Sequence, residues 1–238
     1  MSNIIQQLNF NTLNQSRSKS NPQFNLQGRS LYSIESYAIG SFYCVNTFYT
    51  IDTRNNQFSF SEPDNLIRTF SIPTGNYTVT SFITTLQSLL NGAGTQTYTV
   101  TNNTLTNVLT ITGATKAFII LAINFDCYYE SGFTVSAVSS LSQVATNVFD
   151  FSGVKVVNIV SNSFGFGNNI LVGKSLNVVF SIPITVPSLG VISFINPNPI
   201  FVSTSISEIS TIEFLVYDEL YRPLTMMNNW QLSAYVQI

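Results

Sequence analysis

Short segments of alternating apolar and polar residues recur along this chain, separated by turns rich in Asn, Gly, Pro and Ser. The final stretch, NWQLSAYVQI, shows the pattern most clearly, because every second side chain from Trp230 to Ile238 is apolar. Alternation with a period of two indicates a β-strand with one buried face. Since the pattern runs to the last residue, we expect the final strand to be central in a sheet and its truncation to be costly.

The spacing of these segments predicts the fold class. Roughly eight to eleven of them follow one another at about ten-residue intervals, which is typical of an antiparallel sandwich. Only residues 79–91 have helical periodicity, with Thr78 as candidate N-cap and Gly92 as the stop. The sequence therefore predicts an all-β antiparallel sandwich with one short amphipathic helix at about 79–91.

Three local features are predicted within this pattern. Gly40 interrupts a long aromatic segment and is a candidate β-bulge. Residues 95–113 read as a hairpin around Asn102 and Asn103. Residues of about 126–150 form an irregular region, whose middle could be a loop or a short helix.

The stretch FGFGNNILVGKS, residues 164–175, ends like a phosphate-binding loop. Such a loop needs four residues between its first glycine and the Gly-Lys-Ser, whereas five separate Gly167 from Gly173. It must also open a helix, but the residues after Gly173 alternate as a strand does. We interpret the stretch as a loop between two strands.

The composition argues against catalysis. Histidine is absent, which removes the commonest general base and transition-metal ligand. Cys44 and Cys127 lie in aromatic surroundings and are interpreted as buried free thiols rather than a disulfide, and two cysteines cannot form a tetrahedral zinc site. The carboxylates fall mostly in predicted turns. We therefore predict no enzyme, no cofactor and no metal.

Charge is scarce throughout the chain. Charged residues make up 8% of the 238 residues, against about 25% in a typical protein. A neutral exterior rich in hydroxyl and amide groups suits a protein packed against copies or partners, because charge repulsion would not keep it monomeric. The alternative is that an AT-rich genome enriches Asn, Ile, Phe and Tyr regardless of function.

Residues 1–30 differ from the rest and are predicted to be a flexible basic N-terminal arm. They contain Arg17, Lys19 and Arg29 and no acidic residue, although the whole chain has a net charge of −2. These side chains are candidates for contacts with nucleic acid or a neighbouring subunit. An extended arm lying over another subunit and an ordinary frayed terminus are the alternatives.

The sequence shows neither a secretory signal nor a membrane span. Its first residues lack the basic-then-apolar order of a signal peptide. The apolar run AFIILAI, residues 117–123, is far shorter than the roughly 20 residues that cross a bilayer. We expect a soluble protein made in the cytosol.

Two stretches resemble minor capsid and penton proteins of eukaryotic DNA viruses with jelly-roll capsids, such as virophages and polinton-like viruses. The first, residues 49–91, runs from a strand through an Asn-Asn turn and IPTGNYT into the amphipathic helix. The second, residues 212–238, is similar to the terminal hairpin of that group, with an acidic turn, RPL, an Asn-containing loop and a closing strand with Trp230.

The resemblance implies a single jelly roll over residues 31–238 that acts as a structural virion protein. A chain of this length has room for one jelly roll, which suits a penton protein that forms a pentamer at the fivefold vertices of an icosahedral capsid. The implied partners are copies of itself, the major capsid protein, other virion proteins and genomic DNA through residues 1–30. A minor capsid or cement protein, and a glycan-binding β-sandwich of the fibre-head type, are the alternatives.

Overall fold

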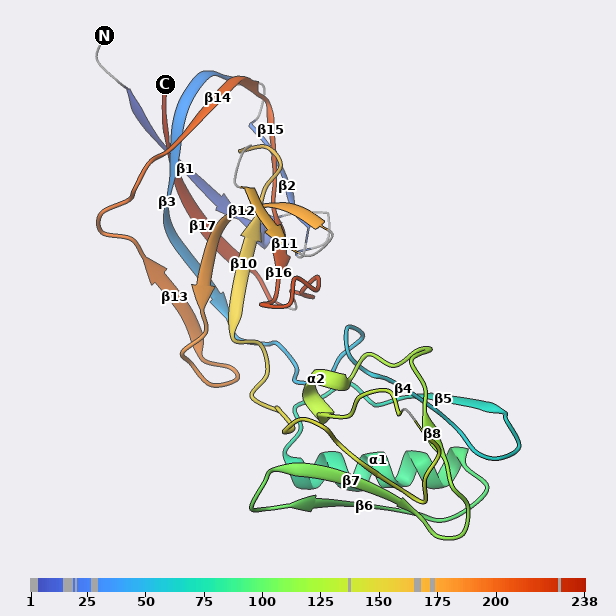
Figure 1. Ribbon diagram of the computed structural model, residues 1–238. Coiled ribbons are helices and arrows are strands. Elements are labelled where there is room, and N and C mark those ends of the chain that lie inside the picture. Colours follow the sequence, from blue (N-terminus) through green and yellow to red (C-terminus); the bar gives the residue numbers. More distant parts are fainter. Residues whose placement is uncertain are drawn as a thin grey trace. The chain divides into compact units, whose positions relative to one another are not determined.

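The chain folds into two compact units, each described here by itself. The computed structural model describes residues 4–14, 19, 21–26, 30–136, 138–164, 168–171, 174–226 and 228–238 (Figure 1). The sandwich unit comprises Met1–Phe48 and Val154–Ile238, and the inserted unit comprises Tyr49–Gly153. This division differs from the expected arm and single domain over 31–238, because the residues of the inserted unit bury their apolar side chains among themselves.

The larger sheet of the sandwich unit has the final strand in its interior. Its order is β1 (Ile5–Asn11), β17 (Trp230–Gln237), β3 (Leu31–Val45) and β13 (Val191–Ile195), and β14 (Val202–Ile209) also pairs with β3. Every pairing is antiparallel. The predicted central position of the last strand is confirmed, since β17 is bonded to β1 on one side and to β3 on the other.

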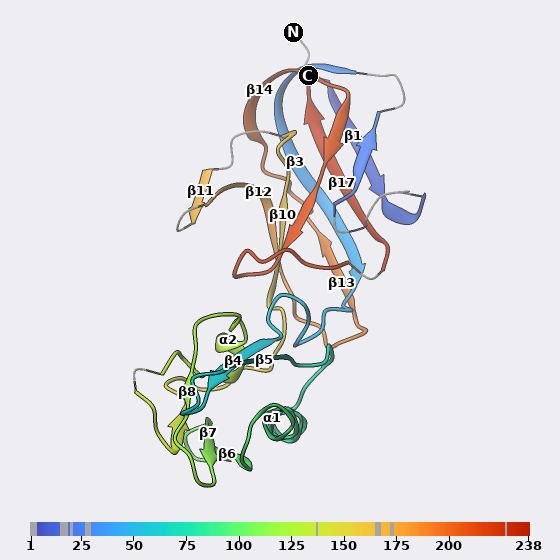
Figure 2. The ribbon, with the colours of Figure 1, turned by 90° about the vertical axis from the view of Figure 1, so that its right-hand side faces the viewer.

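A second antiparallel sheet faces the first across the core (Figure 2). Its order is β11 (Asn168–Leu171), β12 (Lys174–Pro183), β10 (Val156–Val160) and β16 (Leu215–Tyr217). The early strands pair with late ones, β3 with β17 and β10 with β16, as in a jelly roll. The predicted all-β antiparallel sandwich is thereby confirmed.

The glycine-rich stretch at 164–175 belongs to this second sheet. Strands β11 and β12 pair as a hairpin, so a strand and not a helix follows Gly173. Gly165, Gly167 and Gly173 themselves lie outside the described residues.

The predicted arm supplies strands and core side chains to the sandwich unit. Besides β1, it contains the 3₁₀ turn η1 (Thr12–Asn14) and β2 (Gln23–Asn25), which pairs with β15 (Thr211–Glu213). Phe10 and Phe24 are buried and contact each other edge to face at 5.1 Å. Apolar side chains spaced along polar sequence hold these described parts of residues 1–30 in the core, and the flexible basic arm over the whole segment stays a prediction.

Gly40 forms the predicted bulge. The β3–β17 register shifts between Ser233 and Ala234, which pair with Ser41 and Ile39 and leave Gly40 as the extra residue. A Cβ at Gly40 would lie 2.6 Å from a ring carbon of Tyr235. The bulge therefore needs glycine so that the Tyr235 ring can pack over the backbone.

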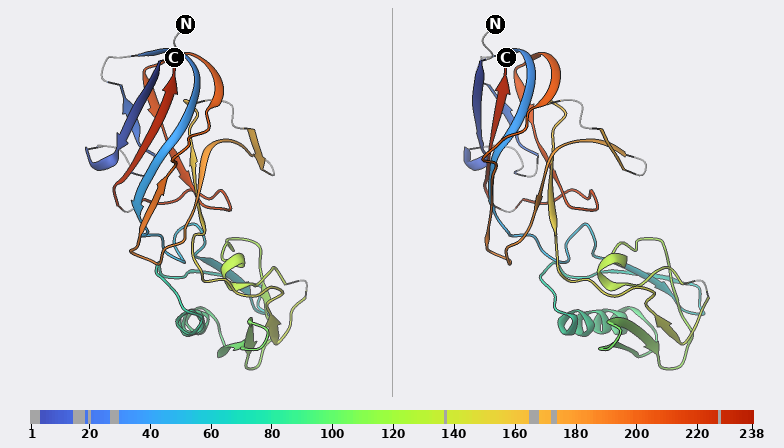
Figure 3. Two further views of the ribbon diagram at one scale, coloured as in Figure 1. Left: turned by 90° about the vertical axis from the view of Figure 1, so that its left-hand side faces the viewer. Right: turned by 60° about the vertical axis from the view of Figure 1, so that its left-hand side comes forward.

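The inserted unit combines two small sheets with two helices (Figure 3). One sheet has the order β5 (Ile67–Ser71), β4 (Gln57–Ser61) and β8 (Ile119–Ile120), and the other has β6 (Tyr98–Asn103), β7 (Val108–Gly113) and β9 (Ser142–Val144). The helices are α1 (Val79–Ala93) and α2 (Tyr128–Ser131). The middle of the region 126–150, expected to be a loop or a short helix, contains the strand β9, and the short helix α2 precedes it.

Helix α1 is confirmed with its predicted N-cap. The Thr78 hydroxyl accepts a hydrogen bond from the Ser81 N–H, and the Ser81 hydroxyl accepts one from the Thr78 N–H, which completes a capping box. Phe82, Leu86 and Leu90 form its buried face. The helix continues past Gly92 and ends at Gly94, whose N–H donates to the Leu90 carbonyl.

The β6–β7 hairpin is confirmed, but its turn lies later than predicted, at residues 104–107. Asn102 and Asn103 remain in β6 and pair with Leu109 and Val108. The Asn103 carboxamide oxygen accepts hydrogen bonds from the N–H groups that follow, and Asn107 takes the left-handed conformation with φ 54°.

Each unit contains one buried thiol, as the sequence predicts. Cys44 lies in the core of the sandwich unit and Cys127 in that of the inserted unit, and neither forms a disulfide. Because the two cores consist of different residues, the thiols should report the opening of the two units separately.

We predict that Phe82→Ala accelerates chemical labelling of Cys127 by more than about 100-fold and leaves labelling of Cys44 unchanged. Truncating a fully buried Phe costs about 3–5 kcal/mol, and this cost should fall on the inserted unit alone. Phe42→Ala is the matched variant in the sandwich unit and should accelerate Cys44 instead. Mass spectrometry after pulsed alkylation measures both rates; equal acceleration of both thiols by either variant would show that the units open together.

Candidate functional site

The structure places only one of the three predicted arm residues. Arg17 and Arg29 lie outside the described residues. The carbonyl of Lys19 accepts a 2.7 Å hydrogen bond from the indole Nε1–H of Trp230, which ties this part of the segment to the core. That these side chains contact DNA or a neighbour remains a prediction.

The outward side of the larger sheet carries no charged side chain over four adjacent strands. Alternation places these side chains opposite the core-facing ones such as Phe10, Phe42 and Leu232. This surface, here called the outer face, consists of Ile5, Gln7, Asn9 and Asn11 on β1, Gln231, Ser233, Tyr235 and Gln237 on β17, Ser36, Ala38, Ser41, Tyr43 and Val45 on β3, and Val191, Ser193 and Ile195 on β13.

Polar side chains of the outer face bond to one another across strands. The Ser36 hydroxyl donates to the Gln237 carboxamide oxygen at 2.9 Å, and the Ser41 and Ser233 hydroxyls share a hydrogen bond of 2.8 Å. Such cross-strand pairs stabilise the sheet and satisfy one another locally. The outer face therefore needs no counter-ion and less dehydration work when covered than a charged surface would.

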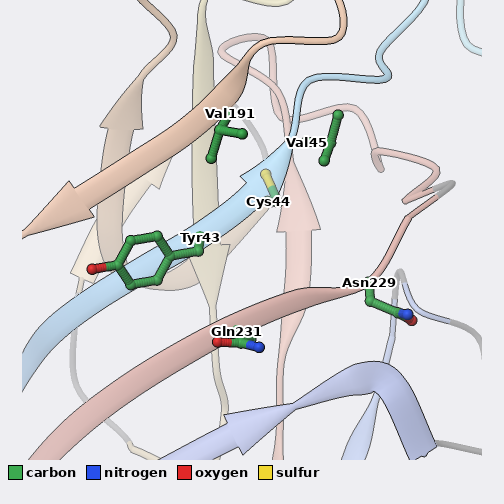
Figure 4. A pocket seen from close by; sticks show the side chains of 6 residues that line it. All are labelled: Tyr43, Cys44, Val45, Val191, Asn229 and Gln231. Atoms are coloured by element: carbon green, nitrogen blue, oxygen red, sulfur yellow. The ribbon is translucent and has the colours of Figure 1, made fainter.

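A shallow cavity of about 330 Å³ opens at one end of the outer face (Figure 4). It is lined by Tyr43, Cys44, Val45, Val191, Asn229 and Gln231. The carboxamide oxygen of Asn229 is buried and has no hydrogen-bond partner among the described residues. Burial raises the pKa of the Cys44 thiol to about 12, so the sulfur is protonated at neutral pH and is no nucleophile.

The described residues contain no group of His, Cys, Asp or Glu that could hold a metal ion. No described helix is long and apolar enough to cross a membrane. The Ser152 hydroxyl donates a hydrogen bond to the Asp150 carboxylate at 2.5 Å.

Buried carboxylates in both units hold turns together. In the sandwich unit Asp218 is fully buried; it accepts hydrogen bonds from the Leu220 and Arg222 N–H groups and from the Arg222 guanidinium at 2.7 Å. Glu219 accepts from the N–H groups of Lys155 and Val156 at the start of β10. The acidic turn before RPL thus has a structural role, because its two carboxylates bond to backbone groups of the turn and of the start of β10.

In the inserted unit Glu62 forms the densest such network. It accepts hydrogen bonds from the Tyr98 hydroxyl at 2.7 Å and from the N–H and hydroxyl of Thr95, and Arg68 lies 3.4 Å away. Burial opposes ionisation of Glu62, but these hydrogen bonds and the Arg68 charge outweigh it, so its pKa lies below the usual value. Arg68 also bonds Asp64 and lowers the pKa of Asp64 to about 2.

The outer face is the feature that motif-based reasoning missed. The sequence does contain a signal for it, which is the lack of charged residues: residues 36–45, 191–195 and 230–238 contain no Asp, Glu, Lys or Arg. Its significance appears only when the register brings these segments side by side.

We predict that the inserted unit loses stability as the pH falls from about 4 to 2. Glu62 and Asp64 have lowered pKa values in the folded state, so the unfolded chain binds more protons in this range and is favoured. Thermal melts followed by circular dichroism at successive pH values measure the loss. Glu62→Gln should flatten the decline, whereas Glu35→Gln, which changes an exposed carboxylate of the sandwich unit, should not; the same slope in both variants would contradict the assignment.

Comparison with known proteins finds similarity among solved structures. No family model and no curated protein matches the sequence. The chain is similar to the crystal structure of the mavirus penton protein, with 11% identity, a TM-score of 0.49, and coverage of 99% of this chain and 100% of the other. An identity and a TM-score this low leave the chain's family and function to be argued from its own residues.

Proposed function

We propose that this chain is a structural virion protein, and specifically the penton protein that forms a pentamer at the fivefold vertices of an icosahedral capsid. The observation that carries the proposal is the charge-free outer face, which spans four strands of the sandwich. The resemblance of residues 49–91 and 212–238 to jelly-roll capsid proteins of virophages and polinton-like viruses supplies the capsid context.

The distribution of charge supports a role in assembly. Some of the few charges pair within the chain, as Arg54 does with Asp52 and Arg222 with Asp218, and the first pair is largely buried. The outer face carries amide, hydroxyl and apolar groups, which can contact a copy of the chain without charge repulsion. A cyclic ring is built from one patch meeting a different patch on the next subunit, which a broad neutral surface permits.

The proposed partners are copies of the chain, the major capsid protein and other virion proteins, so the protein would reside in the virion. Genomic DNA is a further proposed partner through Arg17, Lys19 and Arg29. A non-enzymatic role agrees with the local hydrogen bonds of Glu62, Glu219 and Ser152. A position between major capsomers, as a minor capsid or cement protein, is the alternative within the same class.

One observation favours glycan binding as a second candidate function. Tyr128 and Tyr129 on α2 are 43% and 51% exposed, and their ring centroids lie 4.4 Å apart. The pair continues inward through Phe125 to the buried Phe58. Exposed aromatic rings anchored in this way can stack on the apolar face of a sugar.

We predict that the purified protein has the native mass of a pentamer over a tenfold range of concentration. Tyr43→Lys should weaken this oligomer about tenfold or more, because it places a charge on the outer face that must be desolvated on contact. Asn162→Lys adds the same charge to an exposed residue outside the outer face and should have no effect. Native mass spectrometry and light scattering measure both variants.

The other outcomes separate the alternatives. A trimer would favour a cement or spike protein over a penton. A monomer at every concentration would contradict the penton proposal, and glycan-array binding lost in Tyr129→Ala would then support the second candidate.

A further inference from the structure

Among the described residues, the path β1-β17-β3-β13 of the larger sheet ends in two strands that have no further partner on their outer side, β1 and β13. Neither strand contains a charged residue or a proline, and the β1–β17 register runs without a shift. Proteins normally protect such edges with lysine, proline or bulges, because free backbone groups pair readily with another strand. Two unprotected edge strands that flank the charge-free outer face indicate that a partner covers both edges.

The hydrogen bonds fix which backbone groups are free on β1. Ile4 and Ile238 exchange both of their N–H···O bonds, at 3.3 and 3.1 Å. In an antiparallel ladder such pairs alternate, so the even-numbered residues of β1 bond to β17. The N–H and C=O groups of Ile5, Gln7 and Asn9 therefore point to the open edge.

The same reasoning applies to β13. The Asn46 N–H donates to the Gly190 carbonyl and the Asn196 N–H to the Gly40 carbonyl, both at 2.8 Å. These bonds place the even-numbered residues in the ladder with β3. The backbone groups of 191, 193 and 195 face the other open edge.

The two edges match in the side of the sheet to which the residues with free backbone groups point their side chains. On both strands the residues with free backbone groups are those whose side chains lie on the outer face, such as Gln7 on β1 and Ser193 on β13. In an antiparallel ladder, directly opposed residues point to the same side of the sheet. Joining β1 to β13 would therefore continue the outer face from one copy to the next and keep core-facing side chains on the core side.

The two edges also match in direction. Successive strands in the order β1-β17-β3-β13 are antiparallel, so β1 and β13 run in opposite directions. When copies are related by rotation about an axis inclined to the strands, as in a closed barrel, β13 of one copy lies antiparallel to β1 of the next and is offset along the strand direction. The contact is head to tail, so it continues beyond a dimer and forms a ring when the rotation between successive copies closes.

We propose that copies of this chain associate by pairing β1 of one subunit with β13 of the next, so that one antiparallel sheet runs through the oligomer. The register places Ile5 opposite Ile195, Gln7 opposite Ser193 and Asn9 opposite Val191. It joins two apolar side chains, Ile5 and Ile195, that are 58% and 63% exposed in the single chain. This pairing rests on the proposed function, in which copies of the chain assemble, and it states which strands would form the contact between them.

Disulfide trapping tests this contact. Gln7→Cys and Ser193→Cys are introduced into one chain, and the purified oligomer is oxidised and separated on a non-reducing gel. Directly bonded partners in a ladder have Cα atoms about 5.5 Å apart, within the range that a disulfide spans. We expect a series of disulfide-linked bands on the gel, from dimer up to the number of copies that native mass spectrometry finds in the oligomer. The native Cys44 and Cys127 are buried and can remain.

The controls make the result specific. Each single variant should stay monomeric on the gel, and so should Gln7→Cys with Asn162→Cys, whose second thiol lies outside the outer face. A dimer from Gln7→Cys alone would show β1 paired with β1 and overturn the proposal. An oligomer without cross-links would also overturn the β1–β13 contact but would leave the proposed penton function standing. A monomeric parent protein would contradict both proposals.

Discussion

The sandwich unit depends on the insertion of its last strand between its first two long ones. β17 bonds to β1 and β3 along its length, and Trp230 at its start contacts Phe24, Phe42 and Phe214 at 5.8–6.2 Å. The Thr12 hydroxyl closes the ladder by accepting from the Trp230 N–H. Because β17 supplies the interior of the larger sheet, neither β1 nor β3 can complete its hydrogen bonding until the end of the chain has arrived.

Pairing the two termini in this way leaves the middle of the chain free to form a separate core. The chain leaves the sandwich unit after Phe48 and returns at Val154, and the residues between them pack around Phe82, Phe118 and Tyr98. Helix α1 adds polar bonds to this core, since the Gln87 and Asn91 side chains accept from the N–H groups of β6. A segment that satisfies its own apolar and polar groups can be inserted without disturbing the register of the host sheets.

The sequence predicted what local chemistry determines and missed what register determines. Helix α1 and its Thr78 cap, the Gly40 bulge and the buried thiols follow from patterns a few residues long. The division at Phe48 and Val154 could not be predicted from such patterns, because alternating strands look alike whether they belong to one sandwich or two cores. The outer face escaped for the same reason, as its uncharged residues lie up to about 230 positions apart in the chain.

A charge-free sheet face between two open edge strands is a hazard for a protein that works alone. Such edges promote aggregation unless a defined partner covers them, and neutral surfaces lack the repulsion that keeps molecules apart. On both β1 and β13 the residues with free backbone groups point their side chains to the outer face. The proposed association is therefore specific, because only an antiparallel pairing of these strands aligns the outer faces and buries Ile5 against Ile195. A closed ring leaves no edge to grow from, so the same backbone groups that would drive open-ended association instead set a finite copy number.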